Sequence, residues 1–359
     1  MLAVLAPGQG AQRQGFLADW LSLPGVESRL RALSAEVGID LLGAGTELPD
    51  ETISDTAIAQ PLIVGAGLAV LPELHVDAVT CVFAGHSVGE FTAAAAAGML
   101  GESEAMRLIG VRGAAMARAS AAVPSGMAAV LGGDEQEVLA AISAAGCAAA
   151  NFNCTGQIVA AGPTEALDRL VAAPPNGSRV RPLAVAGAFH TELMASARDA
   201  LAAAASDVTT ADGAGGVLSN RDGGVLTGGA EVLSRLVDQV CLPVRWDACM
   251  STLAALGVTA VIELPPAGTL TALVRRALPG VEVVALRTPE DLPAARELVA
   301  QHTTQPSAAP SWRLLVAPEK GTVRLDDVVA QAGSTLIELL VSDGDPVTAG
   351  QPLARVSAL

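Results

Sequence analysis

The chain has 359 residues, of which 51% are hydrophobic and 16% charged, and its formal net charge is −16. These values describe a globular protein large enough for two or three structural units, and they exclude a generally disordered chain. With 21 Lys and Arg against 37 Asp and Glu, the chain lacks the basic character that a nucleic-acid binder needs.

The first third of the chain alternates between short apolar runs and helical stretches. Residues 2–6 predict a buried strand, 59–71 a buried helix, 80–84 a second strand, and 87–98 and 103–120 two further helices. This alternation predicts a parallel α/β sheet. We expect no apolar run of the ~18–20 residues that cross a bilayer and no signal peptide, so the expected location is the cytoplasm.

The pattern changes between residues 121 and 189. The predicted elements are a strand, a helix, two strands, a helix and a strand, over residues 127–131, 134–145, 147–152, 157–161, 163–172 and 179–185. The order βαββαβ is the ferredoxin-like arrangement. We therefore expect a small ferredoxin-like subdomain over 121–189, inserted into a large α/β-hydrolase-like domain formed by 1–120 and 190–300.

The α/β pattern resumes at residue 190. Helices are predicted over 230–240, 246–256 and 270–278, and strands over 259–264 and 281–286. Residues 301–311 are polar and rich in Pro and Ser, which predicts a linker. Residues 312–359 contain several strand-like runs and predict a small all-β appendage.

The segment Gly85-His86-Ser87-Val88-Gly89 matches the pattern GxSxG. In that pattern a sharp turn between a strand and a helix exposes a serine hydroxyl. The start of the helix would also place backbone N–H groups where an oxyanion develops. An ordinary Gly-rich turn fits the motif equally well, so the motif alone leaves both interpretations open.

A nucleophilic serine needs a base, and the chain has four histidines. His302 lies in the expected linker, His86 adjoins the serine, and His75 sits between apolar residues. His190 ends an apolar run that is predicted as a strand, and strand ends are where α/β proteins build their sites. Elimination therefore favours His190 as the base.

Several further motifs follow one another between residues 2 and 290. They are Pro7-Gly8-Gln9-Gly10-Ala11-Gln12, Gly85 to Glu90, Val111-Arg112-Gly113, Asn151-Phe152-Asn153 with 156–162, Ala188-Phe189-His190, and Gln239 with 243–246. In this order they resemble the malonyl-CoA:acyl carrier protein transacylase family. One departure is residues 263–268, Glu-Leu-Pro-Pro-Ala-Gly, where the family often has Glu-x-Gly-Pro-Gly, so the family's loop shape is not carried over.

The resemblance implies ping-pong acyl transfer from malonyl-CoA to acyl carrier protein. Ser87 would carry the malonyl group, and His190 would activate it and later deprotonate the incoming thiol. The backbone N–H groups of Gln9 and Val88 would form the oxyanion hole. Arg112 would bind the free carboxylate, since a buried carboxylate is costly to leave unpaired and a guanidinium can pair with it through two hydrogen bonds.

The resemblance also implies how the base is oriented. The backbone carbonyl of Gln239 would accept a hydrogen bond from His190, which makes the site a dyad. Asp238 and Asp247 are near in sequence and could complete a triad, but we favour the dyad.

The remaining pocket residues implied by the resemblance are Gln157, Asn153 and Phe189. The ring of Phe189 would crowd an α-methyl branch, so malonyl should be preferred over methylmalonyl by roughly 1–3 kcal/mol. We expect no cofactor, no metal, no nucleic acid and no membrane among the partners, and we expect a monomer.

Residues 314–356 resemble a biotinyl/lipoyl-like domain in the turns around 317–323 and 344–353. The segment is about half the usual length, and it lacks the hairpin that would carry a modified lysine. Lys320 is the only lysine of the chain. We therefore expect an unmodified remnant or a docking piece.

Three alternatives stay open. In a GxSxG hydrolase or thioesterase, water would replace the carrier thiol, and Arg112 would have no role. A stand-alone acyltransferase of a polyketide pathway would use the same chemistry with another carrier. A non-catalytic scaffold built around the C-terminal unit predicts that Ser87→Ala changes nothing.

Overall fold

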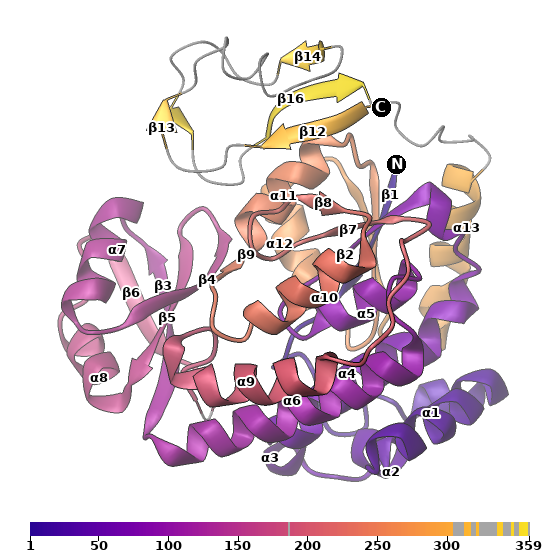
Figure 1. The fold of residues 1–359 in the computed structure, drawn as a ribbon, viewed down its shortest axis with the longest axis horizontal. Helices are drawn as coiled ribbons and strands as arrows, with labels where there is room; N and C mark the ends of the chain where they lie inside the picture. The colour runs from indigo at the N-terminus through magenta and orange to yellow at the C-terminus, as the bar shows by residue number, and fades with distance from the viewer. Residues whose placement is uncertain are drawn as a thin grey trace.

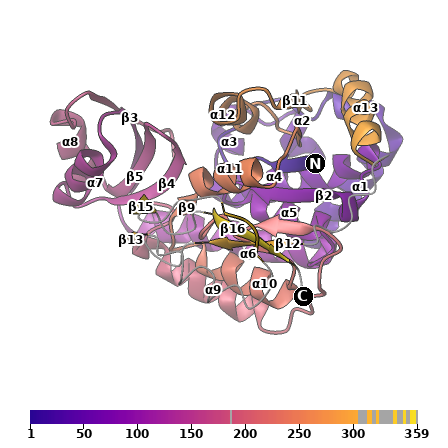
Figure 2. The same ribbon diagram turned by 90° about the horizontal axis from the view of Figure 1, so that it is seen from above.

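The structure is a computed structural model that describes residues 1–185 and 187–303, together with five strands between residues 312 and 357 (Figure 1). Figure 2 shows the same chain from above, with a small sheet and its two helices α7 and α8 lying to one side of the larger part.

A six-stranded sheet lies at the centre of the larger part, with the order β11-β10-β1-β2-β7-β8. Its strands are β1 (Leu2–Ala6), β2 (Cys81–Gly85), β7 (Gly216–Leu218), β8 (Val225–Leu226), β10 (Ala260–Glu263) and β11 (Glu282–Ala285). The neighbours are parallel from β11 to β7, and β8 is antiparallel to β7. The predicted parallel α/β sheet is confirmed, and β7 and β8 are additional to the predicted strands.

Both faces of this sheet are buried, as strand β1 shows. Leu2 and Val4 pack into one hydrophobic core, and Ala3 and Leu5 pack into another. Successive side chains of a strand point to opposite faces, so helices must cover the sheet on both sides. The helices of this part are α1 (Pro24–Val37), α2 (Leu41–Thr46), α3 (Asp50–Ile53), α4 (Thr56–Val70), α5 (Gly89–Ala96), α6 (Glu102–Ala122), α9 (Ala195–Ala205), α10 (Gly229–Asp238), α11 (Trp246–Ala255), α12 (Thr269–Ala277) and α13 (Leu292–Thr303).

Helix α4 is more apolar than we expected. With the following 3₁₀ turn it spans Thr56–Leu74, 19 residues of mean hydropathy 1.6, which by length and composition alone could cross a membrane. The expectation that no such run exists is therefore wrong. Every residue from Ala59 to Val70 is buried within the protein, so packing in the core accounts for the apolar composition of this helix.

The small sheet has five strands in the order β6-β3-β5-β4-β9. Its elements are β3 (Ser125–Gly132), α7 (Glu135–Ala144), β4 (Ala148–Cys154), β5 (Gln157–Pro163), α8 (Thr164–Ala172), β6 (Ser178–Pro182) and β9 (Val244–Arg245). The elements of the 121–189 segment follow the order βαββαβ, and β9 joins them from outside it by pairing with β4. The division of the chain into domains stays a prediction.

The first three residues of the expected linker, 301–303, are helical. Helix α13 continues to Thr303. His302 Nδ1 donates to the Leu298 carbonyl (2.8 Å), and its Nε2 forms a hydrogen bond with the Thr259 hydroxyl (2.9 Å). His302 therefore belongs to helix α13, and the prediction that it lies in a linker is wrong.

Beyond residue 311 the described residues are strands. β12 (Trp312–Val316), β16 (Pro352–Ser357) and β14 (Leu336–Leu339) form an antiparallel sheet, and β13 (Gly321–Thr322) pairs with β15 (Pro346–Val347). Lys320 lies outside the described residues. The resemblance to a biotinyl/lipoyl-like domain stays a prediction.

A buried carboxylate holds the loop that departs from the family pattern. Glu263, at the end of β10, is fully buried, and it accepts the backbone N–H groups of Gly268 (2.9 Å), Leu270 (2.9 Å) and Thr271 (2.8 Å). The first N–H groups of a helix have no partner inside the helix. Glu263 supplies that partner and thereby fixes the start of α12.

We predict that Glu263→Gln destabilises the protein by about 1–3 kcal/mol, because the new NH₂ group replaces an acceptor and leaves a buried backbone N–H unpaired. Urea unfolding measures the difference. The control is Glu282→Gln on the exposed edge of β11, which should change the free energy of unfolding by less than about 0.5 kcal/mol. Equal effects of the two substitutions would contradict the role of Glu263.

Candidate active site

Ser87 lies in the turn between β2 and α5, and its backbone has a left-handed φ of 53°. Such a conformation costs roughly 1–3 kcal/mol for a residue other than glycine. The turn requires glycine on both sides. A Cβ at Gly85 would lie 2.0 Å from the Gly89 carbonyl carbon, and a Cβ at Gly89 would lie 2.2 Å from the oxygen of Ala6. The geometry is therefore that of a nucleophile elbow.

His190 meets the hydroxyl of this serine. Its Nε2 lies 2.8 Å from Ser87 Oγ, and its Nδ1 lies 2.8 Å from the backbone oxygen of Gln239. Because a carbonyl oxygen only accepts, Nδ1 carries the proton and Nε2 is free to accept the proton of the hydroxyl. The predicted strand over 179–185 ends at Pro182, so His190 lies in a loop and not at a strand end.

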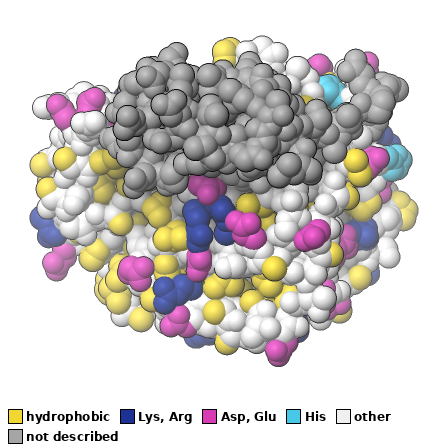
Figure 3. All heavy atoms as spheres, turned by 45° about the horizontal axis from the view of Figure 1, so that its top comes forward, with side chains coloured by type: hydrophobic (Ala, Val, Ile, Leu, Met, Phe, Trp, Pro, Cys, Tyr) yellow, Lys and Arg dark blue, Asp and Glu magenta, His cyan; other side chains and the backbone are white. Residues whose placement is uncertain are grey.

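In the described part of the chain, no carboxylate is hydrogen-bonded to His190 or to the Ser87 hydroxyl. Asp238 pairs with Arg221, and Asp247 pairs with Arg245 at 2.9 Å. Figure 3 shows basic and acidic side chains lying next to one another on one face of the molecule. The third member of the arrangement is therefore the Gln239 carbonyl, which follows the last residue of α10.

Burial, followed by the charge of Arg112, lowers the pKa of His190 to about 3. The ring is only 4% exposed. In the free protein at neutral pH His190 is therefore uncharged, which is the form that can accept a proton.

Arg112, on α6, is fully buried beside the serine. Its Nη1 donates to Gln60 Oε1 (2.8 Å), and its Nη2 donates to Gln239 Oε1 (2.9 Å) and lies 3.5 Å from Ser87 Oγ. Burial lowers the pKa of Arg112 to about 10, so the guanidinium stays charged at neutral pH. Its contacts are with amides and a hydroxyl, so this buried cation can still pair with an incoming carboxylate.

A cavity of about 460 Å³ is lined by Ser87 and His190, and Arg112 reaches it only through its contact with Ser87 Oγ. Its lining includes the candidate residues Gln9, Ser87, Val88, Asn153, Gln157, Phe189 and His190. Among the described residues, no backbone hydrogen bond uses the N–H of Gln9 or Val88, so both are available to an oxygen in the cavity. The structure therefore brings together all the predicted site residues, with Arg112 and Gln239 directly behind Ser87.

Three buried polar residues in this network were not predicted as site residues. Gln60 contacts Arg112, Asn220 accepts the N–H of Ser87 at 2.7 Å, and Glu90 accepts hydrogen bonds from Asn220 and Gln239. Gln60 carries a detectable signal, since it is a polar residue within the otherwise apolar run 59–71. Asn220 follows the unpredicted strand β7, so no pattern pointed to it.

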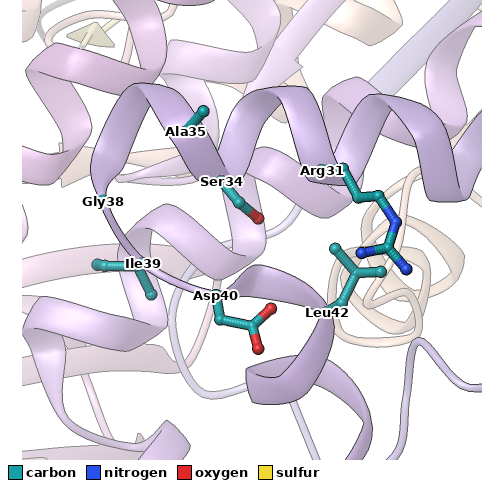
Figure 4. A pocket seen from close by; sticks show the side chains of 7 residues that line it. All are labelled: Arg31, Ser34, Ala35, Gly38, Ile39, Asp40 and Leu42. Atoms are coloured by element: carbon teal, nitrogen blue, oxygen red, sulfur yellow. The ribbon is translucent and has the colours of Figure 1, made fainter.

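A second hollow, of about 370 Å³, lies at the end of α1 and is shown in Figure 4. Arg31 lines it and pairs with Glu27 on the same helix at 2.6 Å. It is open to solvent, and its lining residues include Ser34 and Asp40 but no histidine that could activate the serine.

The acyl transferase domain family matches residues 5–304. The malonyl CoA-acyl carrier protein transacylase of Mycobacterium tuberculosis is 49% identical over 296 residues, which cover 81% of this chain and 98% of that protein. The Escherichia coli K12 protein of the same name is 33% identical over 305 residues, covering 82% and 99%.

Solved structures are similar over the same extent. The crystal structure of MCAT from Mycobacterium tuberculosis has a TM-score of 0.80 and 49% identity, and the match covers 82% of this chain and 99% of that one. A malonyl-transacylase in complex with a type II PKS acyl-carrier protein has a TM-score of 0.76 and 30% identity, covering 83% and 99%.

We predict that the His190 ring does not titrate in NMR spectra between about pH 5 and 8, whereas an ordinary histidine titrates near about 6.5. The four histidines can be assigned by substituting each in turn. Because the charge of Arg112 is one cause of the lowered pKa, Arg112→Gln should raise the pKa of His190. A midpoint near about 6.5 in the unsubstituted protein would contradict the buried, neutral base.

Proposed function

The chain belongs to the acyltransferase family of malonyl-CoA:acyl carrier protein transacylases, and we propose that Ser87, His190 and Arg112 carry out its reaction. The enzyme transfers the malonyl group of malonyl-CoA to the phosphopantetheine thiol of acyl carrier protein and so supplies fatty acid elongation. The observation that carries the residue assignment is the buried guanidinium of Arg112 beside a serine hydroxyl that is hydrogen-bonded to a neutral histidine.

In the first half-reaction, His190 Nε2 takes the proton of Ser87 as Oγ attacks the thioester carbonyl. The oxyanion accepts hydrogen bonds from the backbone N–H groups of Gln9 and Val88. The carbon–sulfur bond then breaks, and the CoA thiolate leaves with the proton held by His190. The product is a malonyl ester on Ser87.

In the second half-reaction, His190 takes the proton of the carrier thiol, and the sulfur attacks the ester carbonyl. The carbon–oxygen bond to Ser87 breaks, and Oγ recovers its proton from His190. Water must be kept away while the ester exists, because it would release free malonate.

The malonyl carboxylate has a second effect in this proposal. When it pairs with Arg112, it offsets the positive charge that helps to lower the pKa of His190. The base therefore becomes stronger when a donor with a free carboxylate is bound. A donor without that carboxylate leaves the cation in place and the base weak.

Phe189 and the polar residues of the cavity support a choice of acyl group. Phe189 is 6% exposed and lines the cavity, where its ring would meet an α-methyl branch. Asn153 is held by a 3.0 Å hydrogen bond with His86 Nε2, and Gln157 stands on the neighbouring strand β5. We assign these three residues to the acyl pocket and expect malonyl to be favoured over methylmalonyl.

Of the alternatives, the non-catalytic scaffold is wrong, since the chain is an acyltransferase. A hydrolase remains less well supported, because water needs no buried arginine. A polyketide carrier is the second candidate acceptor, favoured by the 30% identity with a malonyl-transacylase that was solved with such a carrier. A cytoplasmic location belongs to the proposal too, supported by five free cysteines, which fit a reducing compartment.

We predict that Ser87→Ala forms no malonyl adduct when mixed with malonyl-CoA, because among the described residues that line the cavity no other hydroxyl or thiol is hydrogen-bonded to a histidine. Intact-protein mass spectrometry measures the adduct. Ser251→Ala, on the exposed side of α11, is the matched control and should be acylated like the unsubstituted enzyme. An adduct that persists in Ser87→Ala would contradict the assignment of Ser87 as the acylated residue.

We predict that Arg112→Gln lowers kcat/KM for malonyl-CoA by roughly 30- to 1000-fold, because losing one partner of a buried charge pair costs about 2–4 kcal/mol. Transfer from acetyl-CoA, which has no free carboxylate, should fall much less. Arg118→Gln changes an exposed arginine of the same helix and should leave kcat/KM for both acyl donors unaffected. Equal losses for the two donors would contradict the assignment of Arg112 to the carboxylate.

A further inference from the structure

Glu90 is a buried carboxylate in the first turn of α5, three residues after the nucleophile, and it is 3% exposed. Its Oε1 accepts the backbone N–H of Asn220 at 2.9 Å, and its Oε2 accepts a hydrogen bond from Gln239 Nε2. Neither oxygen contacts the Ser87 hydroxyl or lines the cavity. The acyl transfer described above gives this carboxylate no role.

Gln239 connects Glu90 to the rest of the site. Its Nε2 donates to Glu90 and to the backbone oxygen of Ser87 (3.1 Å), and its Oε1 accepts from Arg112 Nη2 (2.9 Å). A side-chain amide has donors at one end and an acceptor at the other, and a carboxylate can only accept. Glu90, together with the backbone oxygen of Ser87, therefore holds the NH₂ end of the amide away from Arg112 and leaves the oxygen facing it.

The charges agree with this orientation. Burial raises the pKa of Glu90 to about 7, while its hydrogen bonds with Asn220 and Gln239 and the charges of Arg235 and Arg112 oppose that rise. Both groups that face its oxygens are N–H donors, so the ionised form is the one that fits the network. The negative charge of Glu90 in turn favours the charged form of Arg112, with the Gln239 amide between them.

We propose that Glu90 is a positioning residue for malonyl recognition: its carboxylate holds the Gln239 amide oxygen toward Arg112 and so keeps the guanidinium in place for the free carboxylate of the donor. The inference rests on the proposed function of Arg112. The catalytic base depends on a different part of Gln239, because His190 is held by the backbone oxygen. Loss of Glu90 should therefore affect donors with a carboxylate more than the chemistry itself.

The test is Glu90→Gln. The new carbonyl accepts the N–H of Asn220, so the new NH₂ group faces the NH₂ of Gln239. The conflict between these two N–H donors displaces the Gln239 amide, and with it the oxygen that holds Arg112. We expect kcat/KM for malonyl-CoA to fall about 10- to 100-fold, with a much smaller loss for acetyl-CoA. The control is Glu137→Gln, which changes an exposed glutamate in the first turn of α7. It should leave kcat/KM for both acyl donors unchanged.

A double-mutant cycle with Gln239→Leu shows whether Glu90 acts through the amide. Gln239→Leu removes the side-chain amide and keeps the backbone carbonyl, so it should shift the malonyl-to-acetyl ratio in the same direction. In that background Glu90→Gln should shift the ratio no further. An independent, additive shift would overturn the proposal.

The selectivity ratio distinguishes positioning from a structural role. If Glu90→Gln lowers kcat/KM equally for malonyl-CoA and acetyl-CoA, Glu90 only supports the fold and the proposal is wrong. If Glu90→Gln does not fold, Gln239→Leu alone decides, because an unchanged ratio in that variant would also overturn the proposal. Failure of the unsubstituted enzyme to form a malonyl adduct on Ser87 would instead refute the proposed function on which the inference rests.

Discussion

The burial of a charged guanidinium beside the nucleophile is the constraint on which the rest of the site depends. Arg112 has no exposure to solvent and no carboxylate among its contacts, and an ion taken out of water without a counter-ion is costly. The protein offsets part of this cost with the amide oxygens of Gln60 and Gln239. These oxygens hold the guanidinium without neutralising it, so the cation keeps its attraction for a carboxylate that arrives with the substrate.

Gln239 connects the buried guanidinium to the serine and its base. Gln239 contributes three separate groups: its backbone oxygen orients His190, its side-chain oxygen holds Arg112, and its side-chain nitrogen contacts the backbone of Ser87. The end of α10 at this residue leaves the carbonyl outside the helix ladder. The base and the carboxylate-binding group are thus oriented by one residue at one helix end, the base by its backbone and the guanidinium by its side chain.

Much of this could be predicted from the sequence, because some features have local causes. The elbow follows from Gly85 and Gly89, whose lack of a side chain is a condition of the turn, and the parallel sheet follows from the alternation of apolar runs and helices. Long-range features left no such pattern. The strands β7 and β8 are two or three residues long, and Asn220 reaches Ser87 across 133 positions of sequence. The sequence of the βαββαβ segment predicts a sheet formed by that segment alone. The pairing of β9 with β4 depends on tertiary packing, so no local pattern predicts it.

In the function that we propose, the same constraint would account for selectivity between acyl donors without a large pocket. A donor that lacks a carboxylate gains nothing from Arg112, and it must bind beside a buried charge that its acyl group cannot pair with. A malonyl donor supplies the missing counter-charge, so its binding removes an unfavourable feature of the free enzyme as well as adding a favourable contact. Discrimination against a neutral acyl group therefore comes largely from the cost of leaving a buried charge unpaired, which exceeds what the shape of an apolar pocket can provide for a group of this size. We propose that the shape of the pocket, through Phe189, makes the finer choice between malonyl and its methylated analogue.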